Sequence, residues 1–184
     1  MQQIASTAQL RASIARWTLF TVPTCLGLGF LSARLAGNVS DNAWFAALIK
    51  PAIYPPAIAF PIVWTILYIM MGVALALVIA ARGARGRGLA VVAFVAQLLL
   101  NLAWSPVFFA NHQLSLALGI LVALFVALAA TMALAWRVRH MAALLLVPYL
   151  VWVCFAGFLN LQILQLNPAA DGAMVSGAAV RVQL

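Results

Sequence analysis

Five apolar runs, each roughly 20 residues long, limit how this chain can fold more than any other feature. A helix of that length crosses the hydrocarbon core of a bilayer, because each residue adds about 1.5 Å along the axis. Hydrophobic residues make up 67% of the 184, and a small water-soluble domain cannot bury so much apolar surface. The sequence therefore predicts an all-α membrane protein with spans over residues 16–35, 57–81, 89–109, 114–136 and 141–166.

The five spans should form one bundle, since the second, third and fourth connections are too short to separate neighbouring helices. We predict a five-transmembrane-helix bundle over residues 16–166, flanked by flexible tails over 1–15 and 167–184. The first run has basic residues ahead of it, as a secretory signal has. Four further spans follow, so we interpret it as a retained first helix.

The net charge of +8 indicates topology rather than a nucleic-acid partner, because the arginines are dispersed among connections and tails. With five spans, one side of the membrane would hold seven of the ten basic residues, and the other side three basic residues and both acids. The positive-inside bias then predicts a cytoplasmic N-terminus. We expect a multi-pass integral membrane protein of a bacterium, in either its inner or its outer membrane.

The first connection, residues 37–56, is unusually rich in proline and aromatic residues for a link between two spans. Ser40 or Asp41 is expected to cap a short helix over 42–49, which Pro51 should terminate. We interpret this connection as a lid over a binding site that opens inside the membrane.

Three of the spans carry large aromatic or polar side chains on one face at helical spacing. In hydrocarbon, such polar groups either join helices by hydrogen bonds or line a cavity. One aromatic stripe alone is more often plain core packing. Three stripes together predict an apolar slot for a flat, rigid ligand, with these wall residues: Phe60, Trp64, Tyr68, Gln97, Asn101, Trp104, Tyr149, Trp152, Ala156 and Asn160.

Pro61, Pro106 and Pro148 lie inside spans or at their edges. Each lacks the N–H that would bond the carbonyl four residues earlier, so that carbonyl should be free. The sequence leaves open whether these prolines are packing kinks or points of plasticity around a cavity.

Several kinds of site are absent from the sequence. No Asp or Glu lies within a span, so a carboxylate proton relay is not expected. No Ser/His/Asp or Cys/His arrangement suggests nucleophilic catalysis. His112 and His140 fall in connections, where we expect solvated side chains rather than haem ligands. Cys25 and Cys154 are expected to pack as small apolar residues, and we predict no metal site and no obligatory cofactor.

Four motifs follow one another between residues 44 and 160. The first is W-F-x-x-L-x-K-P-x-x-x-P-P from Trp44, and the second is F-P-x-x-W-T-x-L-Y from Phe60. The third is Q-x-x-x-N-x-x-W-S-P-x-F-F from Gln97, and the fourth is V-P-Y-x-x-W-x-x-F-A-x-x-L-N from Val147. With these motifs, the chain resembles the TspO/MBR family of tryptophan-rich sensory proteins and translocator proteins.

The resemblance implies a five-helix bundle, often a homodimer, that binds tetrapyrroles such as protoporphyrin IX and haem. By matched position, the ligand would contact Trp44, Lys50, Pro51, Trp64, Tyr68, Gln97, Asn101, Trp104, Tyr149, Trp152 and Ala156. Some members are reported to degrade porphyrin in light, and the tryptophans that match Trp64 and Trp152 are implicated.

The chain departs from the family pattern at two places. Ile53 stands where the family has an aromatic residue in the lid, which argues against stacking of a ligand ring there. Residues 159–165 lack the Tyr and the basic residue of the sterol-linked pattern, so cholesterol binding should be weak.

Three functions are compatible with these features. We favour a membrane receptor or sensor that binds tetrapyrroles in an aromatic pocket under the first loop. The alternatives are a tetrapyrrole transporter and a light-dependent porphyrin-degrading enzyme. The lack of internal repeats and of coupling carboxylates weighs against an active transporter.

Overall fold

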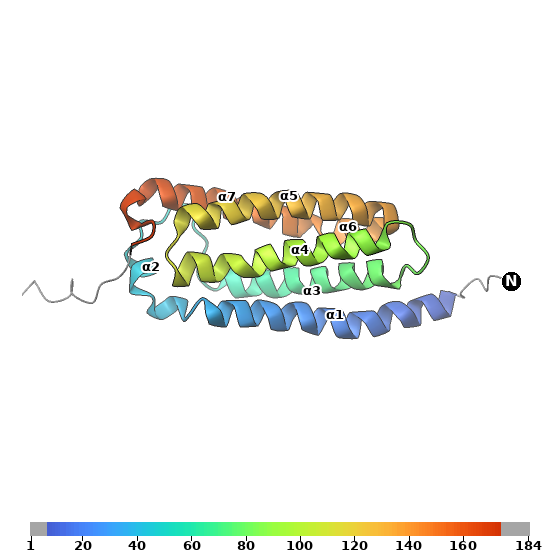
Figure 1. Ribbon diagram of the computed structural model, residues 1–184. Helices are drawn as coiled ribbons and strands as arrows, with labels where there is room; N and C mark the ends of the chain where they lie inside the picture. The colour runs from blue at the N-terminus through green and yellow to red at the C-terminus, as the bar shows by residue number, and fades with distance from the viewer. Residues whose placement is uncertain (1–6, 174–184) are drawn as a thin grey trace, which may run out of the picture.

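The computed structural model describes residues 7–173 and confirms the expected fold class, an all-α bundle (Figure 1). A π-helical turn, η2 (Pro106–Ala110), prolongs one of the long helices, and the short helix α6 (His140–Leu145) precedes another. Within the described residues, five helical segments are long and apolar enough to cross a membrane. The long helices, which run alongside one another, are α1 (Thr7–Leu35), α3 (Ala59–Ala80), α4 (Arg87–Ser105), α5 (Leu114–Val138) and α7 (Val147–Leu166).

Both ends of the described chain are more ordered than the sequence predicts. Helix α1 begins at Thr7, so residues 7–15 are helical rather than part of a flexible tail. These residues are mostly Ala, Leu, Gln and Arg, which favour helix. At the other end, residues 167–173 include the 3-10 turn η3 (Pro168–Ala170) and bond to the rest of the protein. Residues 1–6 and 174–184, the remainder of the two predicted tails, lie outside the described residues.

The lid contains a shorter helix than expected, α2 (Ala43–Ala47), and its cap is a different residue. The side-chain oxygen of Asn42 accepts a hydrogen bond from the backbone N–H of Phe45 at 2.9 Å. Ser40 and Asp41, the predicted caps, lie instead within the 3-10 turn η1 (Val39–Asp41). Asn caps helices as well as Asp or Ser does, and this Asn stands directly before the helix.

Small side chains let α1 and α3 approach closely. The buried residues of α1 are Thr21, Cys25, Gly29 and Ser32, which follow one another at helical spacing. The hydroxyl of Thr21 lies 2.7 Å from the carbonyl oxygen of Gly72 on α3. A Cβ atom at Gly72 would lie 2.6 Å from the Cα of Val22, so only glycine fits there. This is the close packing by small residues that joins helices in lipid.

A hydroxyl on α1 satisfies a carbonyl that a proline leaves free. Pro106 cannot donate to the carbonyl of Leu102, and the hydroxyl of Ser32 donates to that oxygen at 2.6 Å. Pro148 differs from the expectation, because it stands at the start of α7, where a helix needs no N–H donor.

Replacing Gly72 by Ala should lower the free energy of unfolding by about 1–3 kcal/mol. The new methyl group would meet backbone atoms of Val22, which cannot rotate away. The change should appear as a lower midpoint of thermal unfolding in detergent.

Gly119→Ala is the matched control, because Gly119 lies in α5 with no atom within 4 Å of the added Cβ. That variant should unfold at the same temperature or higher, since alanine favours helix. An unchanged midpoint for Gly72→Ala would contradict the close approach of α1 and α3.

Candidate functional site

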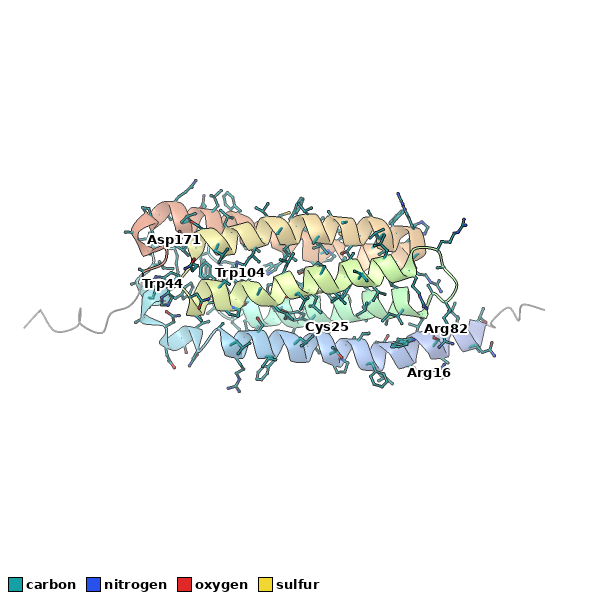
Figure 2. The ribbon with its side chains drawn as sticks, in the orientation of Figure 1. Arg16, Cys25, Trp44, Arg82, Trp104 and Asp171 are labelled. Atoms are coloured by element: carbon teal, nitrogen blue, oxygen red, sulfur yellow. The ribbon has the colours of Figure 1, made fainter. Side chains whose placement is uncertain are left out.

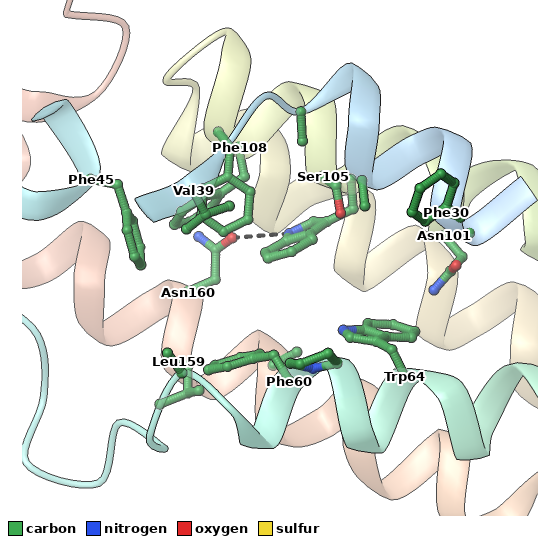
Figure 3. A pocket seen from close by; sticks show the side chains of 18 of the residues that line it. Phe30, Val39, Phe45, Phe60, Trp64, Asn101, Ser105, Phe108, Leu159 and Asn160 are labelled. Carbon is green, nitrogen blue, oxygen red and sulfur yellow. Dashed lines mark hydrogen bonds between the residues drawn. The ribbon is translucent and has the colours of Figure 1, made fainter. Parts of the chain in front are cut away.

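A cavity of about 820 Å³ lies beneath the lid, between the lid segment and four of the long helices (Figure 3). Its wall is mostly apolar. Helix α5 contributes no residue to it. The lining residues are Leu26, Gly29, Phe30, Ala33, Ala36, Val39, Ser40, Phe45, Lys50, Tyr54, Ala57, Phe60, Pro61, Trp64, Thr65, Tyr68, Asn101, Trp104, Ser105, Phe108, Phe109, Ala156, Leu159, Asn160 and Ile163.

The structure brings more than half of the predicted site residues together in this wall. They come from the lid, α3, α4 and α7, as the helical spacing predicts. They are Lys50, Phe60, Trp64, Tyr68, Asn101, Trp104, Ala156 and Asn160. Pro51 is buried in the lid and does not line the cavity.

Trp44, a predicted ligand contact, instead fixes the lid in place. Its ring stacks on His112, with the ring centroids 4.3 Å apart. Its indole N–H donates to the carbonyl oxygen of Ala170 at 3.1 Å. The indole is thus occupied by protein groups on both its face and its edge.

Gln97 and Tyr149 also lie outside the cavity wall, in the core of the bundle. Both side chains have no exposed surface, and their polar ends have no hydrogen-bond partner among the described residues. The Tyr149 ring meets the Trp64 ring edge to face, with centroids 6.3 Å apart. Tyr149 therefore packs against Trp64 on the side away from the cavity.

Trp152 lines a second, much smaller cavity of about 30 Å³. This cavity shares several residues with the large one, among them Phe60, Trp64 and Ala156. The rings of Trp152 and Phe60 have centroids 6.0 Å apart. Trp152 is thus one layer of side chains behind the main cavity.

The polar groups of the wall bond to one another across helices. The hydroxyl of Tyr68 on α3 donates to the side-chain oxygen of Asn101 on α4 at 2.7 Å. The indole N–H of Trp104 donates to the side-chain oxygen of Asn160 on α7 at 3.3 Å, drawn in Figure 3. The side-chain N–H of Asn160 donates to the carbonyl of Leu114 at 3.0 Å. These groups both join the bundle and border the cavity, so the two roles left open by the sequence occur together.

Helix α1 supplies wall residues that the sequence analysis did not identify. A Cβ atom at Gly29 would lie 2.2 Å from the ring of Tyr68, so glycine is needed for that ring to lie against α1. The spacing of small residues along α1 is the sequence signal that indicates this part of the wall. Gly29, Ala33 and Ala36 follow one another at steps of four and three residues.

Residues 167–173, here named the C-terminal strap, fasten the lid to the end of the bundle. The Asn167 side chain exchanges two hydrogen bonds with the backbone of Ile49 in the lid, at 2.8 and 2.9 Å. Ala170 accepts the indole N–H of Trp44. Trp44 and Asp171 lie at one end of the bundle, and Arg16 and Arg82 lie at the other (Figure 2).

The strap is itself fixed to the connection between α4 and α5. The backbone N–H of Gly172 donates to the carbonyl of His112 at 2.8 Å. The carboxylate of Asp171 accepts from the hydroxyl of Ser115 and from its backbone N–H. These bonds stabilise the charged form and hold the pKa of Asp171 below its usual range.

No group of three or more His, Cys, Asp or Glu side chains within residues 7–173 is arranged to hold a metal ion. The described residues of the cavity wall include no His, Cys or Met.

Comparison with known proteins gives one consistent result. The model of the TspO/MBR family matches residues 21–166. The tryptophan-rich protein TspO of Chlorobaculum tepidum is 43% identical over 155 residues, which cover 82% of this chain and 98% of the relative. A tryptophan-rich sensory protein of Cereibacter sphaeroides is 35% identical, with 82% and 92% covered. The translocator protein of Bos taurus is 38% identical, with 80% and 88% covered.

Replacing Asp171 by Ala should loosen the lid, because the strap loses its bonds to Ser115. Backbone amides of residues 43–49 should exchange hydrogen about two- to tenfold faster, the range expected for one net hydrogen bond. Exchange in α6 is the internal control and should not change. Unaltered exchange in the lid would show that the strap does not hold it.

The same contact should respond to pH. The folded-state pKa of Asp171 is lowered. The stabilisation that its carboxylate gives to the folded protein is therefore fully present above the usual value of 3.8, and it is lost as the pH falls through the folded-state pKa. Acidification through this range should speed lid exchange, relative to intrinsic rates, in the unaltered protein more than in Asp171→Ala.

Proposed function

Because the chain belongs to the TspO/MBR family, we propose that it is a membrane receptor or sensor that binds tetrapyrroles in the cavity beneath the lid. The observation that carries the proposal is the cavity, whose volume of about 820 Å³ lies in the usual range for small-molecule sites. Protoporphyrin IX and haem are the proposed ligands. The described wall residues include no His, Cys or Met, and their aromatic rings suit the face of the macrocycle.

The chemistry of the wall suits a flat, apolar ring system. The rings of Trp64 and Tyr68 are stacked, with centroids 5.4 Å apart and an interplanar angle of 29°. Aromatic faces stack on flat ligands and bury large apolar areas. The wall contains nine aromatic side chains: Phe30, Phe45, Tyr54, Phe60, Trp64, Tyr68, Trp104, Phe108 and Phe109.

Sensing and transport differ in what the protein must do after binding. Two relatives are named as a sensory protein and a translocator protein, which supports a role of one kind or the other. Within residues 7–173, the only charged side chain in the wall is Lys50, so this part of the chain offers no carboxylate there to couple a proton to transport. We therefore favour a receptor or sensor, with transport as the alternative.

Protoporphyrin IX should quench the tryptophan fluorescence of the purified protein in a saturable manner. Ala156→Phe should weaken this binding at least about tenfold, because a ring at Ala156 fills cavity space. Ala123→Phe is the matched control, since Ala123 is exposed on α5, and it should bind normally. Equal affinity for both variants would place the ligand elsewhere.

A second candidate function, light-dependent oxidation of bound porphyrin, is favoured by the placement of the indoles. Trp64 and Trp104 line the cavity, and Trp152 lies behind Phe60. An excited porphyrin in the cavity would therefore lie against oxidisable rings, and the photochemistry would be that of the ligand itself.

The double variant Trp64→Phe, Trp152→Phe should slow the light-dependent loss of the porphyrin absorbance band. Each Phe keeps an aromatic ring but is harder to oxidise than the indole. The measurement compares illuminated and dark samples at equal bound porphyrin. An unchanged rate would eliminate the enzymatic function.

A further inference from the structure

Among the residues that the structure describes, Lys50 in the lid is the one charged side chain that lines the large cavity. Every other lining residue is apolar or neutral. The neutral polar pair Tyr68 and Asn101 is already joined by its own hydrogen bond. The electrostatic character of the wall is therefore set by a single positive charge.

Lys50 is held in place by the lid itself. Its ammonium donates to the carbonyl oxygens of Phe45 at 2.9 Å and Leu48 at 3.3 Å. It also lies 4.6 Å from the centroid of the Phe45 ring, as in a cation–π contact. An ammonium has three N–H donors, so these two carbonyls leave one available.

No carboxylate of the described chain neutralises this charge. The chain has two acidic residues, Asp41 and Asp171. Asp41 bonds to the side chains of Asn38 and Ser40, and Asp171 bonds to Ser115. Lys50 is half-buried, and an ammonium without a counter-ion attracts an anion more strongly there than in bulk water.

We propose that Lys50 is a specificity-determining residue that pairs with an ionised carboxylate of the ligand. The cavity would then select amphiphiles with a flat apolar body and an acid group at one edge. The acid edge would lie toward the lid, and the apolar body would lie against Trp64 and Trp104. This inference rests on the proposed function and adds to it the chemical requirement for a free acid.

A lysine that serves only to hold the carbonyls of α2 would give the same hydrogen bonds, so the test must separate the two roles. A cycle of two ligands and two proteins does so. The ligands are protoporphyrin IX, a dicarboxylic acid, and its dimethyl ester. The proteins are the unaltered chain and Lys50→Met, both in nanodiscs, with binding to empty nanodiscs subtracted.

The unaltered protein should bind the diacid about tenfold or more tightly than the ester, the size of effect expected for a charge-assisted hydrogen bond. Lys50→Met should weaken binding of the diacid by about the same factor and leave binding of the ester unchanged. Lys50→Arg should retain the preference for the diacid. Arg34→Met is the matched control, because the Arg34 guanidinium lies over the Phe30 ring but Arg34 does not line the cavity.

Equal weakening of both ligands in Lys50→Met would overturn the inference and assign Lys50 to the structure of the lid. Equal affinity of the unaltered protein for diacid and ester would also overturn it, while the proposed function would stand. If neither ligand binds the unaltered protein, the proposed function fails and the inference fails with it.

Discussion

Hydrocarbon offers no hydrogen-bond partners, and this constraint accounts for most of the polar architecture of the bundle. Ser32 reaches from α1 to a carbonyl of α4 that Pro106 leaves without its helical donor. Tyr68 and Asn101 join α3 to α4, and Asn160 joins α7 to the start of α5. Since a polar side chain inside the bundle can bond only to other protein groups, these pairs draw the helices together, although the polar ends of Gln97 and Tyr149 have no partner among the described residues. The rest of the cavity wall is rich in aromatic rings.

Helical periodicity let the sequence predict the spans and much of the wall. Phe60, Trp64 and Tyr68 share one face of α3, and all three line the cavity. The same reasoning grouped Gln97 with Asn101, yet Gln97 lies fully in the core. Periodicity shows which face of a helix a side chain lies on. It does not show whether that side chain meets a neighbouring helix or a cavity, because this depends on how the helices pack together.

Contacts between distant segments account for what could not be predicted. Helix α1 contributes to the wall because Gly29 lets the ring of Tyr68 lie against it, and these two residues are far apart in the sequence. The segment after α7 is rich in Ala and Gly, so its composition resembled a free tail. Residues 167–173 of this segment are held in place because Asn167, Ala170 and Asp171 each bond to a partner on another element. Trp44 likewise contacts His112 and Ala170, which are distant in the sequence, and it lies outside the cavity wall.

The strap makes the choice of terminus important when the protein is handled in the laboratory. The strap, residues 167–173, bonds to Trp44 and Ile49 of the lid. A tag fused directly after the strap would lie beside these hydrogen bonds. A tag ahead of α1 is the safer choice, because Figure 1 places the start of α1 at the far end of the bundle.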